Sequence, residues 1–373
     1  MSLTACRPHD FPQYPPNYRE YAYVTNGGSD TVTVLDVVNV RVDRELAVGR
    51  HPVALAASPT RNEIYVLNAG TEGANGSVSV IDAEHNTVVA TIPVRRQPLA
   101  IDVDADGARA YVANSASNSI SVIDLKARRE IAQFGAGVEP VAARIAPDGK
   151  SLVVANQAGN SVMVMDPASG QVRAVFAGCP GAASPVILPD SSKVFVACSA
   201  GHQVMAIALA QSQARPGQPE QQADQLEALM DVGRGPSDLA LKPDGGEIFA
   251  SNSLSDSVSE IYNTTDEVGD TYTIGADPVR GLVSRDNALL YVANLRSQEV
   301  TVYSIEDSKR VDTIHVGDGP AAMAFSAAGH LLFVVDSRSG DVAVARIASQ
   351  SLFTMLPAGR NPSAIVDKAF QVQ

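Results

Sequence analysis

Residues 98–124 read PLAIDVDADGARAYVANSASNSISVID, and this stretch contains the unit from which most of the chain is built. A proline-led apolar segment comes first, followed by an Asp-Gly turn and a segment of the form aromatic-Val-x-Asn. A polar turn and an alternating segment, Ser-Val-Ile-Asp, complete this part of the unit. Alternation with period two between turn-forming residues is typical of short β-strands. Tyr111 marks the centre of the unit and serves as its anchor.

Equivalent anchors recur along the whole chain at nearly constant spacing. They are Tyr23, Tyr65, Tyr111, Val153, Phe195, Phe249, Tyr291 and Phe333, with spacings of 42, 46, 42, 42, 54, 42 and 42 residues. The spacing of 46 comes from a longer turn at residues 69–76. The spacing of 54 comes from a polar insertion at about residues 210–225, which we expect to be a mobile loop. A proline precedes six anchors by the same interval, and Ala182 takes this place in the fifth unit.

A unit of about 42 residues with four short strands is typical of a propeller blade. One blade cannot bury both faces of its sheet alone, but neighbours on either side can cover them. The innermost strands are accordingly small or apolar at nearly every position, as in the segment PVALAA at residues 52–57. The sequence therefore predicts an all-β fold, a single closed propeller of eight four-stranded blades, with seven blades as the alternative.

The two ends of the repeat region predict how the ring closes. The repeats start at a second strand, residues 21–26, and end with an unpaired first strand, residues 362–370. We expect the two segments to share one composite blade, which would remove exposed strand edges. The propeller would then occupy residues 21–373, with residues 1–20 as an N-terminal tether.

Composition narrows the functional classes. The 373 residues are 45% hydrophobic and 18% charged, as in a folded chain, and no apolar run is long enough to span a bilayer. The net charge of −13 argues against general nucleic-acid binding. The sequence shows no nucleophile motif, phosphate-binding loop or zinc-ligand spacing, so we expect no catalytic residues, metal or cofactor.

The second-strand segments YVTN at residues 23–26, YVLN at 65–68 and YVAN at 111–114 and 291–294 resemble the YVTN family of β-propeller repeats. The resemblance extends over about residues 21–370. It implies an extracytoplasmic protein of bacteria or archaea, such as a surface-layer-like or periplasmic propeller. Similar repeats form the haem d1 domain of nitrite reductase and the heavy subunits of some quinoprotein amine dehydrogenases. The motif is structural and says little about chemistry.

Candidate ligand-binding residues lie in the connections that lead from an outer strand to the next innermost strand. Arg50, Arg96, Arg234 and Arg360 occupy nearly equivalent positions in these connections, and His51 follows Arg50. The ring should bring them to one mouth of the central channel, which we call the upper mouth. Arginine suits bidentate capture of carboxylate or phosphate. The alternative is that these arginines pair with Glu139, Asp277 and Asp318 in the same connections.

Four charges stand among the small residues of the innermost strands: Asp102, Arg144, Asp238 and Arg280. Innermost strands line the channel, so we expect these side chains to face it. They form either two structural ion pairs between blades or a polar ligand site.

The three cysteines suggest different roles. Cys179 and Cys198 both map to the upper end of the fifth blade, where a disulfide is plausible in an oxidising compartment. Two buried free thiols are the alternative. Cys6 ends the segment LTAC, which has the form of a bacterial lipobox, although the charged and apolar parts of a signal peptide do not precede it.

Together these features predict a non-catalytic, extracytoplasmic binding or scaffold propeller at the periplasm or cell surface. We expect its upper mouth to hold a protein partner or a small anionic ligand. Membrane contact would occur only through a lipid anchor at Cys6, and we expect a monomer. Two alternatives are an enzyme with its site at the same mouth (a lyase, a lactonase or a cofactor-dependent redox protein) and a surface adhesion or assembly protein.

Overall fold

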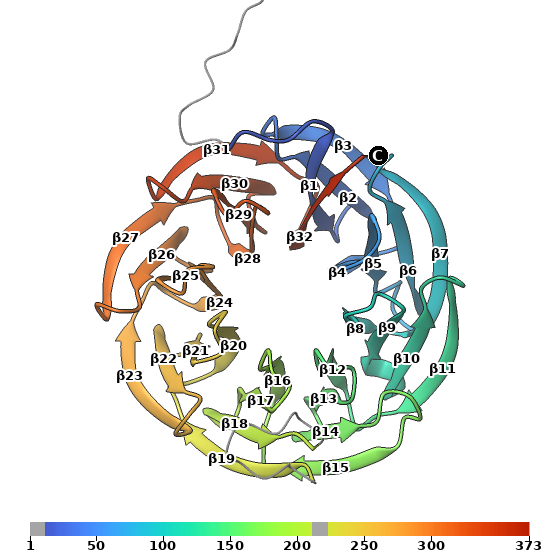
Figure 1. Ribbon diagram of the computed structural model, residues 1–373, viewed down its shortest axis with the longest axis vertical. Helices are drawn as coiled ribbons and strands as arrows, with labels where there is room; N and C mark the ends of the chain where they lie inside the picture. The colour runs from blue at the N-terminus through green and yellow to red at the C-terminus, as the bar shows by residue number, and fades with distance from the viewer. Residues whose placement is uncertain (1–11, 211–222, 373) are drawn as a thin grey trace, which may run out of the picture.

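Eight four-stranded sheets stand around a central axis in the computed structural model, which describes residues 12–210 and 223–372 (Figure 1). All sheets are antiparallel, and each one runs outward from the axis. Each innermost strand contacts the innermost strands of both neighbouring blades, so the ring is continuous. The prediction of an eight-bladed propeller is therefore confirmed, and the seven-bladed alternative is wrong.

The strands occupy four radial positions, and each position recurs once in every blade from the first to the eighth. Innermost are β32 (Pro362–Gln371), β4 (Pro52–Ala57), β8 (Pro98–Val103), β12 (Pro140–Ile145), β16 (Ala182–Ile187), β20 (Pro236–Leu241), β24 (Pro278–Val283) and β28 (Pro320–Phe325). Second are β1 (Tyr18–Asn26), β5 (Glu63–Asn68), β9 (Arg109–Asn114), β13 (Leu152–Asn156), β17 (Lys193–Cys198), β21 (Glu247–Asn252), β25 (Leu289–Asn294) and β29 (Leu331–Asp336). Third are β2 (Thr31–Asp36), β6 (Asn75–Asp82), β10 (Ser119–Asp124), β14 (Ser161–Met165), β18 (Gln203–Ala208), β22 (Ser257–Tyr262), β26 (Glu299–Ser304) and β30 (Asp341–Arg346). Outermost are β3 (Arg41–Ala47), β7 (Thr87–Arg96), β11 (Arg129–Gly135), β15 (Val172–Ala177), β19 (Gln225–Asp231), β23 (Glu267–Thr273), β27 (Lys309–His315) and β31 (Ser351–Pro357).

The first blade joins the two ends of the propeller. Its strand order is β3-β2-β1-β32, with β1 and β32 antiparallel from Tyr18↔Gln371 to Asn26↔Pro362. A side-chain contact strengthens the junction, because the Ala364 amide donates to Thr25 Oγ1 at 3.0 Å. The predicted composite blade is confirmed. Cys6 and most of the insertion at 210–225 lie outside the described residues.

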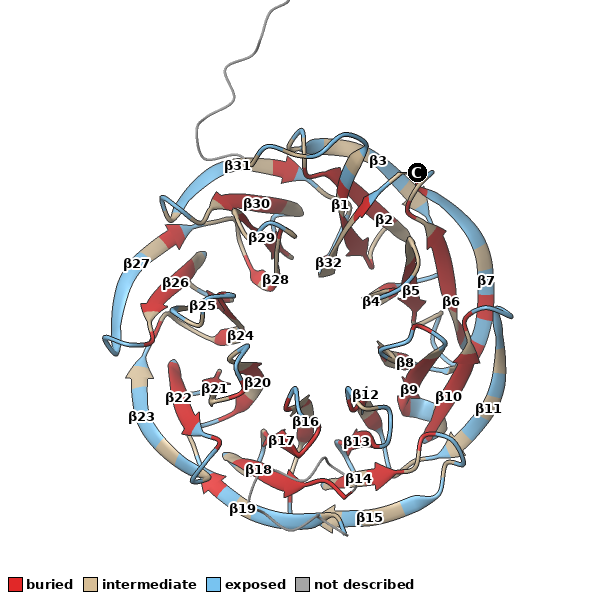
Figure 2. Ribbon diagram, viewed as in Figure 1, coloured by how far each residue is buried: buried red, intermediate tan, exposed pale blue. Residues whose placement is uncertain are grey.

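Burial is concentrated in the second and third strands, which are covered on both faces by neighbouring blades (Figure 2). The anchors Tyr23, Tyr65 and Phe195 are fully buried there. Apolar clusters cross from blade to blade; in one, Tyr65 and Leu67 of the second blade pack with Ile101 and Val112 of the third. The outermost strands are largely exposed (Figure 2). The core is thus divided into apolar layers, each lying between two neighbouring blades, as expected for a repeat protein.

The asparagine that ends most second strands is a buried structural residue. In five blades its side-chain amide donates to a hydroxyl on the third strand, as Asn26 does to Thr33, and Asn294 to Thr301, both at 2.9 Å. The amide of Asn156 has no hydrogen-bond partner among the described residues. The eighth blade departs from this pattern, because Asp336 stands in place of the asparagine and Ala343 in place of the hydroxyl residue. Oδ2 of Asp336 accepts the Gly317 amide at 2.9 Å, while the buried Oδ1 atom has no hydrogen-bond partner among the described residues.

Candidate binding site on the upper rim

The upper rim consists of the outer-to-inner connections and the turns between second and third strands. The two sets are bonded together in each blade: the Gly28 amide donates to Arg360 O, Gly70 to Arg50 O, and Leu254 to Arg234 O, all at 2.9–3.0 Å. The residue just before the innermost strand adopts a left-handed conformation, with φ of 52° at His51 and 50° at Asn361. Histidine and asparagine tolerate this region better than most residues. The rim backbone is therefore fixed by local bonds.

Arg50 is neutralised by a neighbour from the first blade. Its Nη1 atom lies 2.6 Å from Asp30 Oδ2, and the His51 amide donates to Asp30 Oδ1 at 2.8 Å. The His51 amide and then the Arg50 guanidinium hold the pKa of Asp30 below its ordinary value. His51 is turned to the same junction, with Nδ1 3.1 Å from Gly27 O. Arg50 and His51 thus help to join the first two blades.

Arg96, Arg234 and Arg360 differ from Arg50, because none forms an ion pair within residues 12–210 and 223–372. A turn serine holds the backbone of each: Ser117 accepts the Arg96 amide at 3.0 Å, Ser255 that of Arg234 at 2.9 Å and Ser29 that of Arg360 at 3.1 Å. Arg96 Nη2 also donates to Ala116 O at 3.3 Å. All three side chains are exposed, so their charges are available to a ligand.

The acidic residues of the connections have other partners or none. Asp277 pairs with Arg296 at 3.1 Å, and Asp318 with Arg338 at 3.5 Å. Glu139 forms no ion pair in the described part of the chain. The interpretation that these acids neutralise the connection arginines therefore fails at Asp277 and Asp318. The sequence reasoning missed Arg296 and Arg338, although both stand at the same turn position, two residues after the end of the second strand.

Four rim arginines lie in consecutive blades. Arg338 belongs to the eighth blade, and Arg360, Arg50 and Arg96 lead into the first, second and third, whose innermost strands are in contact. Two hollows open along this arc. One, of about 520 Å³, is lined by Arg338 and Arg360. The other, of about 400 Å³, is lined by His51 and Arg96.

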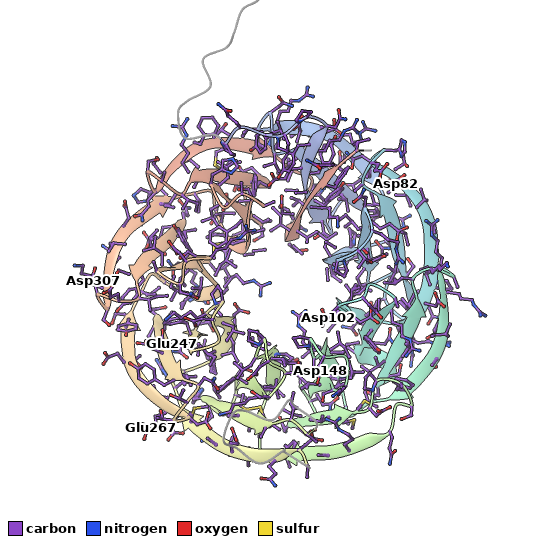
Figure 3. All side chains as sticks on the ribbon, viewed as in Figure 1. Asp82, Asp102, Asp148, Glu247, Glu267 and Asp307 are labelled. Atoms are coloured by element: carbon purple, nitrogen blue, oxygen red, sulfur yellow. A yellow bond between two sulfur atoms is a disulfide. The ribbon has the colours of Figure 1, made fainter. Side chains whose placement is uncertain are left out.

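The channel charges form two ion pairs between neighbouring innermost strands. Arg144 Nη1 lies 3.4 Å from Asp102 Oδ1, and Arg280 Nη1 lies 2.9 Å from Asp238 Oδ1. Asp102 lies on the inner side of the ring, whereas Asp307 and Glu267 lie at its outer edge (Figure 3). Burial raises the pKa of Asp102, and Arg144 opposes that effect.

The second of these pairs is the more extensively bonded. Besides Arg280, Asp238 accepts the Ser184 hydroxyl at 2.9 Å and the Gly281 amide at 3.1 Å. Asp238 therefore connects the fifth, sixth and seventh blades. This geometry favours the structural role for the channel charges over the role of a ligand site.

Cys179 and Cys198 form a disulfide at the upper end of the fifth blade, with their sulfur atoms 2.06 Å apart. Both residues are fully buried. Within the described residues, no group of three or more His, Cys, Asp or Glu side chains is arranged to hold a metal ion. None of the described segments forms a helix that could span a bilayer.

No protein-family model matches the chain. A stretch of 94 residues is 36% identical to the uncharacterized protein YncE of Salmonella typhi, and equally to that of Salmonella typhimurium. This match covers 25% of the chain and 25% of each relative, so the chain spans about a quarter of the length of these curated relatives.

Solved structures resemble the chain over nearly its whole length. Dihydro-heme d1 dehydrogenase NirN in complex with DHE gives a TM-score of 0.75 at 17% identity, covering 97% of this chain and 77% of that one. AztD from Citrobacter koseri gives 0.72 at 14% identity, covering 95% and 99%. Hydrazine synthase of Kuenenia stuttgartiensis gives 0.58 at 21% identity, covering 87% and 92%. At these identities the likeness is one of fold: the chain is an eight-bladed β-propeller.

Proposed function

We propose that this protein is a non-catalytic binding propeller that holds a small anionic ligand, or an acidic segment of a partner protein, on its upper rim. One observation carries the proposal: three exposed arginines at equivalent rim positions, Arg96, Arg234 and Arg360, have no carboxylate partner among the described residues. Guanidinium groups bind carboxylate and phosphate through paired hydrogen bonds. On a chain of net charge −13, these arginines place positive charge at separate points of the rim, with Arg360 and Arg96 leading into the first and third blades and Arg234 into the sixth.

Anions are expected to stabilise the protein through these three arginines. At constant ionic strength, saturating citrate or inorganic phosphate should raise the melting temperature by about 2–4 °C, because binding to the folded state alone shifts the unfolding equilibrium. The triple variant Arg96→Ala, Arg234→Ala, Arg360→Ala should lose this shift, measured by differential scanning fluorimetry.

Arg50→Ala is the matched control, because Arg50 holds the same position but is already paired with Asp30. This variant should keep the shift produced by citrate and phosphate. A shift of equal size in the triple variant, or none in the unaltered protein, would exclude the anion site.

We also propose an extracytoplasmic location, which the disulfide between Cys179 and Cys198 supports, since such bonds persist mainly in oxidising compartments. Protein isolated from its native compartment and alkylated under denaturing, non-reducing conditions should yield these two cysteines as one linked peptide pair. Mass spectrometry of the digest provides the measurement. Two alkylated cysteines would argue for a reducing compartment.

A further inference from the structure

The hollow between the second and third blades has a wall that the other blades lack. The turn at residues 69–76 is longer than its counterparts, and it folds back on itself through a bond from the Ala74 amide to Thr71 O at 3.0 Å. Its base is held to the rim by the Ala69 amide, which donates to His51 O at 2.9 Å. The turn therefore encloses about 400 Å³ against the next connection, within the usual range for small-molecule sites. We call this hollow the 2–3 pocket.

Charges of opposite sign line the 2–3 pocket. Arg96, the last residue of outermost strand β7, contributes a guanidinium, and Glu72 contributes a carboxylate from the long turn. The bond from Nη2 to Ala116 O holds the guanidinium against the third blade, leaving its other donors without partners among the described residues. Glu72 is exposed, and no ion pair joins it to Arg96 or to any other described residue.

Apolar side chains lie in the same pocket. Val53 comes from innermost strand β4 and Leu99 from innermost strand β8, and both are half-buried. The lining thus offers a cation, an anion and apolar surface within one small volume. A ligand complementary to it carries a carboxylate, an ammonium group and an apolar body.

We propose that the 2–3 pocket binds the zwitterion of a short apolar peptide. The peptide carboxylate would bind Arg96, its ammonium group would bind Glu72, and its side chains would cover Val53 and Leu99. This inference rests on the proposed function, because it assigns a ligand class to one of the three unpaired rim arginines. It goes further by requiring a negative partner, Glu72, in the same site.

Three probes separate the contributions of the two charges. Leu-Leu dipeptide carries both charged ends, 4-methylpentanoyl-leucine lacks the ammonium group, and leucyl isopentylamide lacks the carboxylate. In isothermal titration calorimetry, Leu-Leu should bind, and each truncated analogue should bind at least about 10-fold more weakly, because each lost charge-assisted hydrogen bond costs at least a factor of ten.

Two variants and one control locate the site. Arg96→Ala should weaken Leu-Leu binding at least about 10-fold, and Glu72→Gln should reduce it to the level of 4-methylpentanoyl-leucine. Glu139→Gln should leave it unchanged, because Glu139 is an exposed carboxylate in the connection into the fourth blade and does not line the 2–3 pocket. All three side chains are exposed, so melting temperatures without ligand should be unchanged in the variants.

The outcomes distinguish this inference from the proposed function. Equal binding of Leu-Leu and 4-methylpentanoyl-leucine, with no effect of Glu72→Gln, would overturn the zwitterion site and leave the anion site standing. The same conclusion would follow if Leu-Leu failed to bind while citrate still raised the melting temperature through the rim arginines. Loss of both signals would overturn both proposals.

Discussion

Asp238→Ala is expected to lower the free energy of unfolding by about 2–4 kcal/mol, because it removes a buried carboxylate that accepts several hydrogen bonds. The carboxylate is almost fully buried and accepts hydrogen bonds from Arg280, Gly281 and Ser184. Alanine would remove the acceptor of the Gly281 amide and the Ser184 hydroxyl at the junction of three blades, whereas Arg280, which is 45% exposed, can bind water instead. Urea denaturation followed by circular dichroism measures the change.

Asp102→Ala provides the matched control, because Asp102 also pairs with an arginine across a blade junction. Its ion pair is longer, at 3.4 Å, and its side chain is 23% exposed against 6% for Asp238. The loss should therefore be smaller, about 1–2 kcal/mol. Equal losses in the two variants, or no loss at Asp238, would show that the Asp238 contacts do not stabilise the ring.

Asp336→Asn is expected to stabilise the protein at alkaline pH. Burial, and then the neighbouring Asp341 carboxylate, raise the pKa of Asp336 to about 8, against the opposing effect of the Gly317 amide. The protonated carboxyl can donate a hydrogen bond to the neighbouring Asp341 carboxylate. Its contribution is complete below the unfolded pKa of about 4 and is lost as the pH rises through about 8. At pH 9 the variant should gain about 2–4 kcal/mol over the unaltered protein.

The test compares melting temperatures of the two proteins between pH 4 and pH 9. Their difference should be small at pH 4 and grow with pH, because asparagine does not titrate. Part of the pH dependence should remain in the variant, since burial and the adjacent Glu20 raise the pKa of Asp367 to about 9. A constant difference across this range would mean that Asp336 is already ionised in the folded protein at low pH.

The repeat spacing was sufficient to predict the blades, because each unit packs only on its neighbours. The anchors, the innermost prolines and the composite blade all follow from one period. Asp102 and Arg144 hold the same position in adjacent repeats, as do Asp238 and Arg280, so their pairing was also accessible from the sequence. The departure at Asp336 was visible as well, but its effect depends on the side chains opposite it on the third strand.

The state of each rim arginine could not be predicted in the same way. It depends on which turn residue stands beside it. Asp30 forms an ion pair with Arg50. Asp277 and Asp318 instead form ion pairs with Arg296 and Arg338, which belong to turns of their own blades. These are contacts between loops, where the repeat pattern is weakest. The 2–3 pocket was likewise hidden, since the spacing of 46 residues revealed a longer turn but not the side chains that it faces.

The composite blade also determines when folding can finish. Thr25 and Ala364 meet in it although 339 residues separate them, so one edge of β1 stays unpaired until β32 has been synthesised. Contacts of such long range form slowly, because the intervening chain must first be ordered. During synthesis the seven other blades can assemble before β32 is present. Until then the unpaired edge of β1 is exposed and can pair with other chains. Ring closure through β32 is therefore the last strand pairing that the chain can form as it is synthesised.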